Sequence, residues 1–133
     1  MSDHFGPFQV PSGLIDEYGH VNYKHFPSLF EPAQDAFMKQ RKIGFAEIEK
    51  AYGLRSVIKK CAVTYHYQLF EGKEVWVETT LRLGTTSLTY TQVMKDWMMG
   101  VAACVATLEL VVVLIESDGK PCPIPEDLRA LLS

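Results

Sequence analysis

The spacing of apolar positions changes along the chain and predicts the order of its elements. Residues 7–15 are typical of a short first strand, weakened by Pro11 and Gly13. The apolar positions that follow recur at helical spacing and predict a long amphipathic helix that ends near Gly44. Its apolar stripe consists of Phe26, Leu29, Phe30, Ala33 and Phe37. A short second helix should then end at Gly53.

A twofold alternation follows and predicts four more strands joined by hairpins, over residues 56–69, 74–83, 88–98 and 102–115. The last of these is apolar on both faces, whereas an antiparallel strand normally shows water one polar face. A partner subunit is the simple candidate to cover the second face. In the first of the four, one face is expected to carry Val57, Cys61, Val63, Tyr65, Tyr67 and Leu69.

A short helix should close the chain, so the pattern as a whole predicts one α+β domain over residues 1–133. A sheet that wraps around one buried helix would satisfy both the helical stripe and the long alternating strands.

Composition and charge exclude several classes of protein. With 47% hydrophobic and 22% charged residues among 133, the chain is globular rather than disordered. A net charge of -3 with scattered basic residues gives no reason to expect nucleic acid as a partner. The first residues lack the features of a signal peptide, and the longest apolar run is shorter than the roughly 20 residues of a spanning helix, so no membrane insertion is expected. Three separated cysteines without a C-x-x-C motif indicate free thiols and a cytoplasmic location.

The segment "DEYGHVNY", residues 16–23, gathers the candidate chemistry. Gly19 permits a tight turn, and Asn22 is a favourable residue to begin a helix. The backbone N–H groups of Tyr23 and Lys24 should then lack intrahelical partners and suit a developing oxyanion. Asp16 lies close enough in sequence to reach the same place. A carboxylate beside such donors can activate water or attack directly, on an activated acceptor such as a thioester rather than an amide.

Simpler roles are also open for the same residues. Asp16 and Glu17 could only favour the turn and the helix start, at about 1 kcal/mol or less. His20 either lines the site or holds the loop through a hydrogen bond from its ring to the backbone. The remaining histidines lack metal-ligand spacing, and neither a G-x-S-x-G motif nor a Gly-rich phosphate loop occurs.

The run Asp-x-x-Gly-His-Val-Asn at 16–22, with an aromatic at Phe26 and the pair Phe30-Glu31, resembles the signature of hotdog-fold acyl-CoA thioesterases of the 4-hydroxybenzoyl-CoA thioesterase type. The ending "DGKPCPIPEDLRALL" also looks like that of this family. The resemblance therefore covers nearly the whole chain.

This resemblance implies a hotdog fold, a five-stranded antiparallel sheet wrapped around one long central helix. It implies hydrolysis of an acyl-CoA or acyl-carrier-protein thioester, and self-association to a dimer or tetramer with active sites at subunit interfaces. It implies no metal and no cofactor. The catalytic set would comprise Asp16 as base or nucleophile, the backbone N–H of Tyr23 as carbonyl ligand, and Gly19, His20, Asn22 and Glu31. Glu31 is open to a second interpretation, because some hotdog thioesterases use a helix Glu as the catalytic group itself.

The acyl group would lie beside the long helix near Phe26 and Phe30, and Lys59 and Lys60 could meet the phosphates of CoA or form a solvated strand end. The chain departs from the family pattern at five positions, Leu14, Tyr23, Phe26, Pro32 and Gln34. These departures keep a non-catalytic acyl-thioester-binding hotdog module open as an alternative. A hotdog hydratase or dehydratase is the other alternative, although those enzymes carry different motifs.

Overall fold

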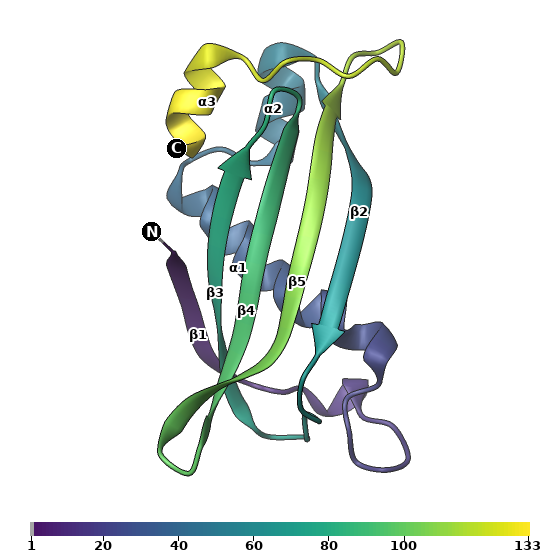
Figure 1. The fold of residues 1–133 in the computed structure, drawn as a ribbon. Helices are drawn as coiled ribbons and strands as arrows, with labels where there is room; N and C mark the ends of the chain where they lie inside the picture. Colours follow the sequence, from purple (N-terminus) through teal and green to yellow (C-terminus); the bar gives the residue numbers. More distant parts are fainter. Residues whose placement is uncertain (1) are drawn as a thin grey trace.

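Five antiparallel strands and one long helix make up most of the molecule (Figure 1). The computed structural model describes residues 2–133. The strands lie in the order β1-β3-β4-β5-β2, and their bounds are Asp3–Gln9 (β1), Arg55–Tyr65 (β2), Glu74–Leu83 (β3), Ser87–Met98 (β4) and Val101–Ile115 (β5). The helices are Phe26–Gln40 (α1), Phe45–Tyr52 (α2) and Glu126–Leu132 (α3), with short 3-10 turns at Ser12–Leu14 and Tyr23–His25. The predicted α+β class and the five-stranded antiparallel sheet are confirmed.

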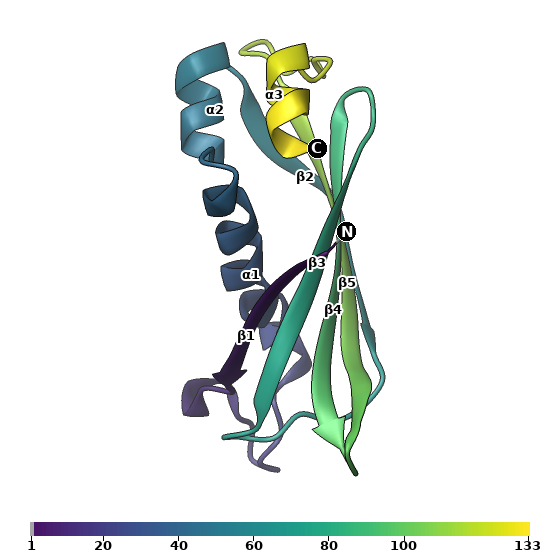
Figure 2. The same ribbon diagram turned by 90° about the vertical axis from the view of Figure 1, so that its left-hand side faces the viewer.

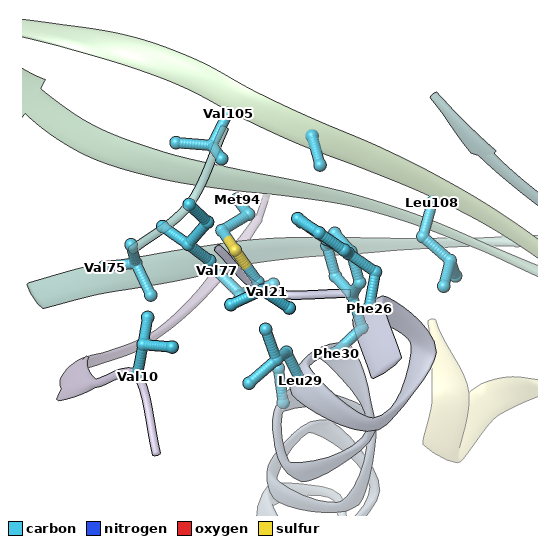
Figure 3. Packing of buried hydrophobic residues seen from close by; sticks show 13 residues of the cluster. Val10, Val21, Phe26, Leu29, Phe30, Val75, Val77, Met94, Val105 and Leu108 are labelled. Carbon is cyan, nitrogen blue, oxygen red and sulfur yellow. The ribbon is translucent and has the colours of Figure 1, made fainter. Parts of the chain in front are cut away.

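The helix α1 packs along one face of the sheet (Figure 2). Its predicted stripe is buried, and Phe30 is fully inaccessible to solvent. Figure 3 shows Phe26, Leu29 and Phe30 of this stripe against strand residues, which include Val75, Val77, Met94, Val105 and Leu108. Each such aromatic or aliphatic side chain contributes about 1.5–3 kcal/mol when it leaves water, so this layer is the main source of stability.

A buried polar network joins α1 to the sheet within this apolar layer. Gln92 on β4 is fully buried, and its Nε2 donates to the Phe30 carbonyl at 3.2 Å and to Thr79 Oγ1 at 3.0 Å. Gln34 Nε2 donates to Gln92 Oε1 at 2.8 Å. Gln34 is one of the positions at which the chain departs from the family pattern. Here its side chain attaches α1 to β4.

Several boundaries differ from the sequence prediction. The first strand lies at Asp3–Gln9 instead of 7–15, since the segment with Pro11 and Gly13 forms a 3-10 turn. The helix α1 ends at Gln40 rather than near Gly44, because Lys42 adopts a left-handed conformation with φ 61°.

A β-bulge between Ile58 and Lys60 corrects the predicted face of β2. Val57 pairs with Val113, whereas Cys61 pairs with Leu110, and these two positions of β5 point to opposite sides. Val57 therefore lies on the outer face, and Cys61 faces the helix layer. One extra residue in a strand reverses the alternation, which is why the pattern alone placed Val57 wrongly.

Candidate active site

The loop before α1 folds around the carboxylate of Asp16. The Asp16 N–H donates to the His20 carbonyl at 2.8 Å, and the Gly19 N–H donates to the Asp16 carbonyl at 3.1 Å. Asp16 Oδ1 accepts from the N–H groups of Tyr18 at 2.9 Å and His20 at 3.1 Å. Gly19 closes this turn with φ 81°, a conformation that only glycine adopts without strain. The loop thus fixes the orientation of the carboxylate, and Oδ2 has no protein partner among residues 2–133.

The approach to the helix is longer than the sequence suggested. Asn22 begins a 3-10 turn rather than α1 itself, and α1 starts at Phe26. Asn22 Oδ1 accepts the N–H of Lys24 at 3.2 Å, so one of the two donors expected to be free is occupied. The Tyr23 N–H makes no hydrogen bond to any residue that the structure describes. One backbone donor is therefore left at the helix start.

Asp16 and Tyr23 line the same hollow, which has a volume of about 340 Å³. The other walls come from the loop before α1, from the start of α1, and from the end of β2 and the segment after it. They consist of His20, Val21, Phe26, Tyr65, His66, Tyr67, Gln68 and Leu69. The residues around the hollow thus include one with a carboxylate, one with an unpaired N–H and several aromatic ones, and such groups can hold and polarise an acyl carbonyl.

Tyr65 connects the end of β2 to the helix start. Its hydroxyl donates to the Tyr23 carbonyl at 3.0 Å, and its ring packs edge-on against Phe26 with centroids 4.9 Å apart. Burial raises the pKa of the Tyr65 hydroxyl, with a smaller contribution from Tyr23, so the group stays protonated and remains a donor. The sequence assigned no role to Tyr65, because 42 positions separate it from Tyr23 and no local pattern marks the contact.

His20 lines the hollow, and its ring packs edge-on against Phe70 with centroids 4.8 Å apart. Its backbone forms an isolated bridge with Phe70. The loop-holding interpretation thus has support from packing, although the predicted hydrogen bond from the ring is not seen among the described residues.

Six predicted site residues are not among those that line this hollow. Gly19 and Asn22 shape the loop and the turn beside it, and the other four lie elsewhere. Phe30 is part of the core, and Glu31 faces a separate groove of about 360 Å³ beside Gln34 and Ile58. Lys60 Nζ pairs with Glu109 at 2.7 Å, where the Lys60 ammonium lowers the pKa of that carboxyl. Lys59 is exposed on β2.

Within residues 2–133, no three His, Cys, Asp or Glu side chains gather in a way that could hold a metal ion. None of the helices in that range is long and apolar enough to cross a membrane.

Comparison with known proteins places this chain in a family. The model of the Thioesterase-like superfamily matches residues 10–132, so the chain belongs to that superfamily. This confirms the family predicted from the motif at 16–22. No curated protein matches the sequence.

Solved structures confirm the hotdog fold. A mutant of 4-hydroxybenzoyl-CoA thioesterase in complex with 4-hydroxybenzoyl-CoA matches with a TM-score of 0.86 at 15% identity over 99% of both chains. A 1,4-dihydroxy-2-naphthoyl-CoA thioesterase from Synechocystis has a TM-score of 0.84 at 14% identity, over 98% of this chain and 96% of that one. A thioesterase from Thermus thermophilus, complexed with coenzyme A and Zn, has a TM-score of 0.79 at 26% identity, over 99% of this chain and 98% of that one.

Proposed function

We propose that this protein hydrolyses an acyl-CoA or acyl-carrier-protein thioester in the hollow at the start of α1. One observation carries the proposal: in a chain of the Thioesterase-like superfamily, one cavity is lined by Asp16, whose Oδ2 is free, and by Tyr23, whose N–H is unpaired among the described residues. The solved relatives named as thioesterases, two of them with CoA compounds bound, support the substrate class.

In the proposed reaction, the Tyr23 N–H donates to the thioester oxygen and stabilises the charge that develops there. Asp16 then acts in one of two ways. As a base it takes a proton from water, whose oxygen attacks the acyl carbon. As a nucleophile it forms an acyl anhydride that water later cleaves. In both routes the C–S bond breaks, the thiolate leaves and takes up a proton, and the free acid is released.

The free Oδ2 of Asp16 suits either role. Oδ1 is held by two backbone N–H groups, which fix the plane of the carboxylate. The second oxygen is left for water or for the acyl carbon. Gly19 and Asn22 serve this arrangement by shaping the turn and the helix start, and His20 forms part of the wall.

We also propose that the active protein is an oligomer built on β2. This strand is an edge of the sheet, and all of its residues except Val63 are exposed. An exposed edge with large apolar side chains is a ready surface for pairing with another chain. Ile58 is 59% exposed and Tyr65 45% exposed. Since Tyr65 also lines the hollow, a subunit paired along β2 would lie next to the proposed site.

The groove that contains Glu31 is the proposed continuation of the acyl site, since it runs between α1 and β2 past Leu108 and Leu110. Glu31 would contact substrate there rather than share the hollow with Asp16.

The three cysteines are unpaired, which supports the proposed cytoplasmic location.

The substitution Asp16→Asn tests the proposal. It keeps the size of the side chain and its acceptor oxygen for the turn, but removes the base and nucleophile. Thiol release from a panel of acyl-CoA compounds should fall at least about 100-fold, the usual contribution of a general base. Glu17→Gln is the matched control, because Glu17 is exposed next to Asp16, and it should retain activity.

Binding separates the enzyme from its alternative. The Asp16→Asn protein should still bind a thioester that it no longer hydrolyses. If the unmodified protein binds acyl-CoA saturably and releases no thiol from any compound of the panel, the non-catalytic binding module is correct instead.

A further inference from the structure

The outer face of the sheet, which is turned away from α1 (Figure 2), carries both tryptophans of the chain. Trp76 lies between Val75 and Val77, which pack into the core beneath α1, so alternation along β3 directs its ring outward. Trp76 pairs with Lys95 of β4, and Trp97 lies two positions further along the same face. Large aromatic side chains gathered on the solvent side of a sheet are typical of a binding surface.

Both rings border a cavity of about 380 Å³ that is formed by β1, β3 and β4. Its other lining residues are His4, Pro7, Glu74 and Glu78. The strand register places them on one face, because His4 pairs with Glu78 and alternate positions of β3 point the same way. The ring centroids of Trp76 and Trp97 are 5.3 Å apart, and those of His4 and Trp76 are 6.1 Å apart. Three rings from three neighbouring strands therefore form a row beside the cavity.

Trp97 supplies the open aromatic surface of this row. Its side chain is 62% exposed, whereas Trp76 is 8% exposed because the rings of His4 and Trp97 flank it. The Trp76 ring is also held in place, since its Nε1 donates to Glu78 Oε2 at 3.0 Å. Trp76 is thus a fixed base against which Trp97 packs, and Trp97 offers ring surface to a ligand.

The carboxylates beside the rings give the cavity a negative charge. Lys95 Nζ lies 3.3 and 3.0 Å from the two oxygens of Glu78, so these two charges compensate each other. Glu74 is exposed and forms no salt bridge within the described part of the chain. The lysine next to it, Lys73, pairs with Asp96 at 3.2 Å instead. The uncompensated charge at the cavity is therefore the carboxylate of Glu74.

We infer that this cavity binds an organic cation, a quaternary ammonium group of the choline type that lies against the Trp97 ring beside the Glu74 carboxylate. The face of an aromatic ring attracts a cation, and the indole ring does so most strongly. The methyl groups of such a cation also cover apolar ring surface, which a hydrated metal ion does not. An anion would be repelled by Glu74, and a neutral apolar group would leave this charge without a partner.

The inference does not depend on the proposed hydrolysis. The cavity shares no lining residue with the Asp16 hollow or with the groove that contains Glu31. It also stays open in the proposed oligomer, because β2 is at the opposite edge of the sheet from β1 and β3.

Titration of the full chain with choline chloride at constant ionic strength, followed by tryptophan emission and by calorimetry, tests the site. Both tryptophans line the cavity, so a change in their emission reports binding there. We expect a saturable change with a dissociation constant on the order of 1 mM, since a single partly exposed cation–π contact is weak. The neutral isostere of choline, in which a carbon atom replaces the nitrogen, should produce no saturable change.

Two substitutions locate the binding further. Trp97→Leu should weaken choline binding about fivefold in calorimetry, and Glu74→Gln about threefold. Both side chains are exposed, so the fold should tolerate either change. Glu116→Gln is the matched control, because Glu116 is exposed beyond the far end of β5 and its loss changes the net charge as Glu74→Gln does. It should bind choline as the unmodified protein does.

A choline group can be free or can be the head group of a lipid. Vesicles of dioleoylphosphatidylcholine present the second form, and a change in emission with either form supports the inference and identifies the source. Unchanged emission with both forms would overturn it. An equal response to the neutral isostere, or undiminished affinity in Trp97→Leu, would overturn it as well.

Discussion

At the scale of single residues, the site depends on how firmly the Tyr23 peptide is held. The loop on one side is fixed by Asp16, and the hydroxyl of Tyr65 holds the Tyr23 carbonyl from the other side. Tyr65 is therefore a positioning residue, since it acts on the oxyanion donor through the backbone.

Tyr65→Phe removes one hydrogen bond and keeps the ring that packs on Phe26. A neutral hydrogen bond contributes about 1 kcal/mol, so we expect kcat to fall about fivefold with little change in KM, and the free energy of unfolding to fall by no more than about 1 kcal/mol. Tyr67→Phe is the control, because Tyr67 lines the same hollow and its hydroxyl has no partner among the described side chains. An equal loss in both variants, or a loss confined to KM, would contradict this role.

The sequence predicted part of this site for a physical reason. The turn around Asp16, Gly19 and Asn22 is local, and its conformational requirements are visible in consecutive residues. The contact from Tyr65 is made across the fold, and the occupation of the Lys24 N–H depends on a 3-10 turn of only three residues. Neither the Tyr65 contact nor the hydrogen bond of the Lys24 N–H produces a periodic pattern in the sequence.

At the scale of elements, α1 was predictable because an apolar stripe at helical spacing is itself the surface that packs on the sheet. Its end was not, because no local pattern marks the left-handed backbone of Lys42, and Arg41 beside it pairs with a residue of β1. Arg41 donates to the Phe37 carbonyl at 3.0 Å and pairs with Asp3, which lies 38 positions away. The bulge at Ile58 and Lys60 likewise arises from pairing with β5, which alternation along one strand cannot show.

The polar network of Gln92 should contribute measurably to the attachment of α1. Gln92→Leu fills the same volume but leaves Thr79 Oγ1 and Gln34 Nε2 without the partner they now share. We expect the free energy of unfolding in urea to fall by about 2–4 kcal/mol. Thr91→Val, at the exposed neighbouring position of β4, should change it by about 0.5 kcal/mol or less. Equal effects of the two substitutions would show that the network is energetically neutral.

At the scale of the whole molecule, the two edges of the sheet differ. β1 is a short edge whose partner β3 extends beyond it, whereas β2 is long, exposed and apolar in places. The unused hydrogen-bonding groups of β2 favour pairing with an identical strand, and closed twofold pairing is the commonest way to remove such an edge. The sequence raised this expectation through the two apolar faces of the strand predicted at 102–115 and through the family resemblance, not through β2 itself.

Ile58→Glu tests this arrangement, because it places a charge on the exposed edge in each of two facing strands. Light scattering during size-exclusion chromatography should give a multiple of the 15.0 kDa chain for the unmodified protein, and the substitution should halve that mass. Val101→Glu is the control, since Val101 is 66% exposed at the hairpin between β4 and β5 and the change in charge is the same. The mass alone decides this test, because Ile58 also lines the groove proposed for the acyl group and a charge there would lower thiol release in any oligomeric state. A single-chain mass for an active unmodified protein would show that one subunit suffices, and the proposed role of the β2 edge would then be wrong.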